Sequence, residues 1–228
     1  NDQGRGGIRI LTGGAMGSSF FIVDVFVKGG PVMIPILICS ILALTITLQR
    51  IRFFSKMKIA SDVFMRRIKG ALASGDFVEA MRICRKENHP LSEVIAAGID
   101  HLNLPKEGLL DSMRQEALRQ MKRLTKFHGV LSTISSVSPL LGLTGTVTGM
   151  ITAFSVISTI GVGDPTALAG GISEALYTTA AGLFVGIPAL VAYNWCEENV
   201  SSFEQEVEYC TLDLANFIND RGGEVARE

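Results

Sequence analysis

Basic side chains are absent from a large part of this sequence. Residues 129–194 contain no lysine, arginine or histidine, and their only acids are Asp164 and Glu174. Residues 29–49 contain no acidic or basic side chain at all. The apolar residues, which make up 47% of the 228, gather in these blocks instead of spreading periodically along the chain. Blocks of this length and composition are typical of membrane spans and not of a soluble core.

Other shortages exclude whole classes of function. A net charge of −1 gives no reason to expect a nucleic acid partner. The four cysteines form no CxxC pair and have no histidine at ligand spacing, so we expect free thiols and neither a metal site nor a cofactor. A hydrolase in the membrane would need a base beside its nucleophile, but His89, His101 and His128 all lie outside the uncharged blocks. We therefore expect that the protein is not an enzyme.

Three stretches are long enough to cross a hydrocarbon core of ~30 Å as helices that rise ~1.5 Å per residue. The first predicted span covers residues 29–50. The later uncharged block is too long for one crossing, and its sequence IGVGDPTALAGG supplies Gly, Asp and Pro where a turn is expected. We divide it into a second span at 129–160, a turn at 161–169 and a third span at 170–195.

Lysine and arginine set the expected orientation. They cluster in RIRFFSKMK after the first span and in RQMKRLTKFH before the second, whereas the predicted turn has none. By the positive-inside rule, residues 51–128 are cytoplasmic, residues 1–28 lie outside, and residues 196–228 return to the cytoplasm as a helix. The chain begins at Asn1 without a methionine, so we expect the start to have been processed, left out or replaced by cloning residues.

The predicted cytoplasmic segment reads as helices without any strand-like alternation. A helix is expected to start at Ser61 or Asp62 and to break near residues 74–76. The run GLLDSMRQEALRQMKRLTKF is expected to continue directly into the second span. The sequence therefore predicts an all-α integral membrane protein with three transmembrane helices and a helical cytoplasmic bundle.

Small and weakly polar residues form a stripe on the second span. A phosphate loop is excluded there, because no lysine follows the last glycine. Helical spacing of three and four residues places on one face Ser135, Ser138, Gly142, Gly145, Thr146, Gly149 and Ala153. Small residues let helices approach closely in lipid, so we expect this face to be a packing seam.

The third span repeats the same design. Its small and polar side carries Gly171, Glu174, Thr178, Thr179, Ala181, Gly182 and Gly186. Pro188 is expected to kink this helix and to free a backbone carbonyl. An ionisable group in a span, such as Glu174, usually faces the bundle interior or an aqueous path. The alternative for Glu174 is a hydrogen-bonded carboxylate at the outer interface, close to Asp164.

The three spans also resemble those of a known family. The stretches GGPVMIPILICSILALTITLQRIRFF, SPLLGLTGTVTGMITAF and GGISEALYTTAAGLFVGIPALVAYN are similar to the spans of the MotA/TolQ/ExbB proton-channel family, in its ExbB/TolQ branch. The resemblance covers residues 26–199 and includes the large loop between the first two spans.

This resemblance implies a homopentamer in the lipid of the bacterial inner membrane, with a periplasmic N-terminus and a cytoplasmic C-terminus. The pentamer would enclose the helices of an ExbD- or TolR-like single-span dimer, and ion flow would drive motion passed on through a TonB- or TolA-like protein. The pore threonines of the family fall on Thr146 and Thr179 and its glutamate on Glu174, while Pro139 and Pro188 match its span prolines.

Three further threonines leave the coupling ion open. Thr144 lies where the family commonly has an apolar or aromatic residue, and Thr148 and Thr178 add further hydroxyls near the implied ion pathway. Their oxygens could suit sodium as well as protons, or they could be satisfied by backbone carbonyls four residues earlier. Two other functions also stay open. One is a membrane scaffold or assembly adaptor, and the other is a flagellar-stator-like subunit, which is disfavoured because that branch usually has four spans.

Overall fold

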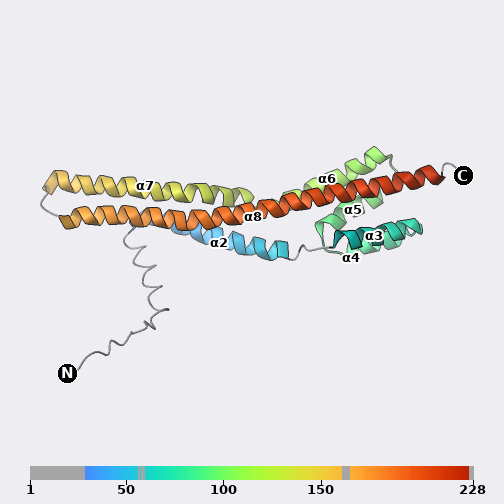
Figure 1. The fold of residues 1–228 in the computed structure, drawn as a ribbon, viewed down its shortest axis with the longest axis horizontal. Helices are drawn as coiled ribbons and strands as arrows, with labels where there is room; N and C mark the ends of the chain where they lie inside the picture. The colour runs from blue at the N-terminus through green and yellow to red at the C-terminus, as the bar shows by residue number, and fades with distance from the viewer. Residues whose placement is uncertain (1–28, 56, 58–59, 161–164, 226–228) are drawn as a thin grey trace, which may run out of the picture. The chain divides into compact units, whose positions relative to one another are not determined.

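The fold consists of helices joined by short connections. A computed structural model describes residues 29–55, 57, 60–160 and 165–225, and these contain no strand. In chain order the helices are α2 (Met33–Ser55), α3 (Ser61–Ala73), α4 (Phe77–Lys86), α5 (Pro90–Asp100), α6 (Lys106–Leu124), α7 (His128–Ile160) and α8 (Pro165–Val225) (Figure 1). The predicted all-α fold is confirmed.

Three of these helices are long and apolar enough to cross a membrane. They are α2, α7 and the first part of α8. Large apolar side chains on α2 are exposed, such as Ile34 at 64% and Leu44 at 62%, which is the surface that lipid would cover. The three predicted spans are therefore confirmed in number and order, whereas their limits in the bilayer stay predictions.

Helix α8 begins earlier and runs further than the predicted third span. It starts at Pro165, inside the segment 161–169 where we expected a turn, and continues without a break to Val225. Proline suits the first turn of a helix because the amide hydrogen that it lacks has no partner there. Residues 161–164, including Asp164, lie outside the described part of the chain. The expected C-terminal helix is thus the continuation of the third span.

The expected continuation of the helix at residues 108–127 directly into the second span is wrong. Helix α6 ends at Leu124, and the chain turns at Thr125–Phe127 before α7 begins. Phe127 has a φ of +69°, which is uncommon for a residue with a side chain. The Thr125 hydroxyl donates to the Met121 carbonyl at 3.0 Å and so satisfies one of the last carbonyls of α6.

The chain divides into two compact units, which we describe separately. The first unit contains the described residues up to Ala43 and Thr133–Pro188, and the second contains Leu44–Ser132 and the described residues from Ala189 onward. The second unit has a hydrophobic core built from one face of each of its amphipathic helices. Side chains with no exposed surface in this core are Ile68, Ala80, Leu91, Val94, Ile95, Met113, Leu124 and Leu214.

Three cysteines belong to this core, Cys84, Cys196 and Cys210. Cys84 on α4 and Cys210 on α8 are both buried and free. Burial raises the pKa of the Cys84 thiol to about 12 and that of the Cys210 thiol to about 11. Because only the thiolate is strongly nucleophilic, both side chains behave as small apolar groups.

A histidine caps the start of α5 in the second unit. His89 Nδ1 accepts a hydrogen bond from the Leu91 amide at 3.1 Å, and His89 Nε2 lies 3.0 Å from the Met57 carbonyl. These partners fit a neutral ring that carries its proton on Nε2. Burial lowers the pKa of His89, in agreement with this neutral form.

We expect the stability of this unit to fall as the pH drops below ~6.5, the ordinary pKa of histidine. The pKa of His89 is lower in the folded state than in the unfolded state, so the unfolded state binds a proton first as the pH falls. The free energy of unfolding therefore decreases between the ordinary pKa and the lower pKa of the folded state. His89→Asn keeps a capping side chain and should make thermal unfolding less sensitive to pH between 7 and 5. His101→Gln is the control, because His101 is exposed. An unchanged pH profile for His89→Asn would contradict the assignment.

Candidate functional site

Helices α7 and α8 approach each other backbone to backbone in the first unit, where they run side by side (Figure 1). A Cβ at Gly142 would lie 3.0 Å from Thr179 Cα, and one at Gly182 would lie 2.5 Å from the Ser138 carbonyl oxygen. The distance at Gly182 is shorter than real Cβ contacts, and the distance at Gly142 would require the backbone of α8 to shift. The predicted packing seams of the two helices are therefore brought face to face.

The same close approach repeats along both helices. A Cβ at Gly186 would lie 2.7 Å from Pro139 Cδ, and one at Gly149 would lie 2.8 Å from the Gly171 carbonyl oxygen. A Cβ at Gly145 would collide with the side chain of Thr178. Glycines spaced in this way let two helices gain dispersion contacts and place polar side chains within reach of the opposite backbone.

Two threonines join the helices through their hydroxyls. Thr146 Oγ1 on α7 and Thr179 Oγ1 on α8 are hydrogen-bonded to each other. Thr179 Oγ1 also donates to the Gly142 carbonyl at 3.0 Å, and Thr146 Oγ1 lies 3.4 Å from the carbonyls of Gly142 and Ala175. Both threonines are half-buried. Since Gly142 has no side chain, α8 comes close enough for Thr179 to reach a carbonyl of α7.

The other threonines near this pair use their hydroxyls within their own helices. Thr144 donates to the Leu140 carbonyl at 2.9 Å, and Thr148 lies 3.1 Å from the Thr144 carbonyl. Thr178 donates to the Glu174 carbonyl at 2.5 Å and has no exposed surface. Of the two alternatives for these hydroxyls, the structure has the bonds to carbonyls four residues earlier. The hydroxyls of the Thr146–Thr179 pair, by contrast, form a polar link between α7 and α8.

Glu174 lies away from the threonine pair. Its carboxylate contacts the backbone of Gly30, just before the start of α2, and its side chain is half-buried. Gly30 has a φ of +66°, a conformation that favours glycine, and a Cβ there would collide with Glu174 Oε1. The carboxylate therefore sits beside the first turn of α2, where its negative charge is favourable.

A shallow groove of about 660 Å³ runs along α7 and contains Thr146 at one end. All of its lining residues come from this one helix, namely Thr146, Val147, Met150, Ile151, Phe154, Ser155 and Ser158. Sequence reasoning missed the groove, although the last six residues recur at steps of one, three and four along a helix. With walls from one helix only, the surface fits a second apolar helix, and Thr146 would be within reach of a polar group on it.

Comparisons with known proteins show which family this chain resembles. Residues 86–209 match the MotA/TolQ/ExbB proton channel family. The chain is 36% identical over 192 residues to an ExbB-like biopolymer transport protein of Synechocystis, which covers 82% of the chain and 74% of that relative. It is 30% identical over 209 residues to the biopolymer transport protein ExbB of Neisseria gonorrhoeae, covering 83% of the chain and 93% of the relative. The Tol-Pal system protein TolQ of Haemophilus influenzae is 38% identical over 114 residues, 50% of the chain and 47% of the relative.

Proposed function

This chain belongs to the MotA/TolQ/ExbB proton channel family, in its ExbB/TolQ branch, and we propose that it is the ring-forming subunit of an ion-driven motor in the bacterial inner membrane. Families of this kind are transport components and not enzymes. The observation that carries the proposal is the Thr146–Thr179 hydroxyl pair beside an open apolar groove on α7.

The chain by itself offers an incomplete path for ions. Among the described residues of its spans, Glu174 is the one carboxylate, and no basic side chain follows it before the end of the third span. Proton transfer through a membrane needs ionisable groups, so a partner must supply at least one. We assign this group to a single-span ExbD- or TolR-like dimer whose helices lie against the α7 groove.

The threonine pair has the chemistry to assist such a group. Each hydroxyl can donate one proton and accept another hydrogen bond, and the hydroxyl hydrogens can rotate. When the Thr179 hydroxyl donates to Thr146 instead of to the Gly142 carbonyl, Thr146 accepts that bond and can turn its own hydrogen toward a carboxylate on the partner. The same oxygens can replace part of the hydration of a cation. Glu174 and Thr178 are the further residues that we propose for the pathway, at the side of α8 where the Thr178 hydroxyl donates to the Glu174 carbonyl and the Glu174 carboxylate contacts Gly30.

The assembly that follows from this function is a homopentamer around the partner dimer. Its chains would have a periplasmic N-terminus and a cytoplasmic C-terminus, and they would pass motion to a TonB- or TolA-like protein. Two features of the sequence support this orientation. Basic residues follow the first span and precede the second, and residues 129–194 contain no basic side chain.

Ion flux into liposomes tests the proposal. We expect the chain reconstituted with its co-encoded single-span partner to conduct protons or sodium under an imposed gradient, and either protein alone to conduct at the background rate. Separate proton and sodium gradients identify the ion. Assembly of the two proteins without flux under either gradient would favour a membrane scaffold instead.

A further inference from the structure

The part of α8 in the second unit presents acidic residues on two opposite faces. Glu206 is bonded by the Ser61 hydroxyl of α3, and Asp213 accepts from Lys69 Nζ of α3 at 2.5 Å. Glu204 and Glu208 are exposed. Because each residue of a helix is turned by ~100° from the last, Glu204 points ~200° away from Glu206. Helix α3 therefore covers one side of α8, and Glu204 and Glu208 lie on the other.

On that other side, α6 and α8 form a groove of about 360 Å³. Its apolar lining comes from Leu110, Ala117, Leu118, Met121, Phe203, Val207 and Leu212. Three acids and one arginine line the same groove, namely Asp111, Glu204, Glu208 and Arg114. Leu118 and Leu212 are 65% and 45% exposed, so the groove combines uncovered apolar surface with net negative charge.

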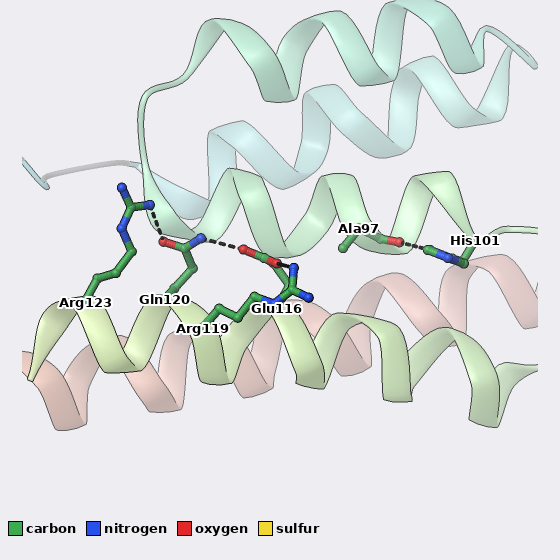
Figure 2. Close-up of polar contacts among 6 residues, drawn as sticks. All are labelled: Ala97, His101, Glu116, Arg119, Gln120 and Arg123. Atoms are coloured by element: carbon green, nitrogen blue, oxygen red, sulfur yellow. Dashed lines mark hydrogen bonds and ion pairs between the residues drawn. The ribbon is translucent and has the colours of Figure 1, made fainter.

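The polar side chains on the opposite edge of α6 bond to one another and not to the residues of the groove. Figure 2 shows a ladder of polar side chains along this edge, in which Arg123 and Gln120 are 3.3 Å apart and Gln120 donates to Glu116 at 2.6 Å. Arg119 adds an ion pair to Glu116 at 3.3 Å. These groups are satisfied within α6, whereas Leu118, Leu212, Glu204 and Glu208 of the groove are exposed.

Helix α3 has a complementary outer face. Val63, Arg66, Arg67 and Gly70 are spaced by three and four residues, and all are exposed. Val63 is 48% exposed, and a Cβ at Gly70 would have no neighbour within 4 Å. Arg67 lies 3.8 Å from Glu87, and Arg66 forms no ion pair with any residue that the structure describes. Val63 and Gly70 thus give this face a centre of apolar and small residues, and Arg66 and Arg67 add positive charge beside it.

The groove and the outer face of α3 lie at the same level along α8. The bonds of Ser61 and Lys69 place α3 beside residues 206–213 of α8, and the groove spans residues 203–212. Copies inserted with one orientation in a membrane are related by rotation about the membrane normal, so they join two different surfaces at one level. In a ring whose axis is parallel to residues 203–213 of α8, these two surfaces on opposite sides of the second unit would meet.

We propose that the outer face of α3 in one copy docks into the α6/α8 groove of the next copy. Val63 enters the apolar part of the groove, and Arg66 and Arg67 pair with Glu204 and Glu208 of the neighbour. The partner is a second copy of this chain because the two surfaces match in charge, in apolar character and in level. This inference rests on the ring proposed above and identifies the residues that close it outside the membrane.

Cross-linking between copies tests the contact. Two differently tagged chains, one with Val63→Cys and one with Leu212→Cys, are co-expressed and oxidised, and we expect a disulfide-linked heterodimer. The matched control replaces Val63→Cys by Val78→Cys, because Val78 is 81% exposed but lies on α4, away from this face. The native chain gives the background from its own four cysteines, of which Cys84, Cys196 and Cys210 are buried and Cys39 is half-buried.

Charge reversal provides the second arm. Arg66→Glu with Arg67→Glu should raise the concentration at which the detergent-solubilised ring dissociates by at least ~10-fold, and adding Glu204→Arg with Glu208→Arg should restore it. Both arms supporting the contact would establish it. An intact ring with normal ion flux, but without the cross-link or the charge effect, would overturn this inference and leave the proposed function standing. Absence of both ring and flux would overturn the proposed function itself.

Discussion

Thr179→Val is expected to reduce partner-dependent ion flux by at least ~10-fold, with the ring still assembled. Valine keeps the shape of threonine and removes the hydroxyl that donates to the Gly142 carbonyl and bonds to Thr146. Thr146→Val removes the other half of the pair and should have the same effect. A hydrogen bond to a charged group contributes ~1.5–3 kcal/mol, which corresponds to a ~10- to 150-fold change in rate when it is lost from the transition state.

Thr144→Val is the matched control for both variants. Thr144 lies on the same helix, but its hydroxyl is exposed and bonds only to the Leu140 carbonyl of its own helix. Flux should therefore stay close to that of the native chain. The measurement is the initial rate of ion entry into liposomes, with the mass of the oligomer checked for each variant. Native flux in both Thr146→Val and Thr179→Val would remove these residues from the pathway and favour a role in packing.

Gly182→Leu is expected to prevent the first unit from forming. A Cβ at Gly182 would already lie 2.5 Å from the Ser138 carbonyl oxygen and 3.0 Å from Gly142 Cα, and leucine adds a branched group to it. Backbone atoms of α7 cannot rotate away as a flexible side chain can. Even Gly182→Ala should cost ~1–3 kcal/mol of stability through overpacking. Thermal unfolding in detergent and the yield of monodisperse protein measure both effects.

Gly170→Ala provides a control with the opposite sign. Gly170 also lies on α8, but a Cβ there would meet nothing within 4 Å. Replacing glycine by alanine inside a helix contributes ~1 kcal/mol when no clash occurs, so this variant should be unchanged or slightly more stable. Equal unfolding temperatures for Gly182→Ala and Gly170→Ala would contradict the close contact of α7 and α8.

Composition and periodicity were sufficient to predict the helical fold and the three spans. The uncharged blocks determine which segments can enter lipid, and the glycine spacing indicates which face of each helix packs. The register between α7 and α8 was beyond such reasoning, because periodicity describes one helix at a time. That Thr179 reaches the Gly142 carbonyl depends on this register, and only the family resemblance had selected Thr179 in advance.

The turn between α6 and α7 was missed for a different physical reason. Left-handed backbone is usually signalled by glycine or asparagine, but here it occurs at Phe127. The aromatic ring offers an explanation, since it lies 5.8 Å from Arg50 Cζ and 5.0 Å from Lys126 Nζ. Cation–π contacts of this kind contribute ~0.5–2 kcal/mol each, which is comparable to the cost of the conformation. Such a balance depends on residues distant in the sequence.

The groove on α7 has a consequence for how one subunit can be reused. Its lining is apolar apart from three hydroxyls, and dispersion forces have no direction, so many helices of suitable width could occupy it. A surface of this kind selects a helix by its shape. The ionisable group and the specificity for a process then come from the bound helix. One such subunit could then work with different partner helices. Exchange of the partner helix would couple the same ion flow to a different process.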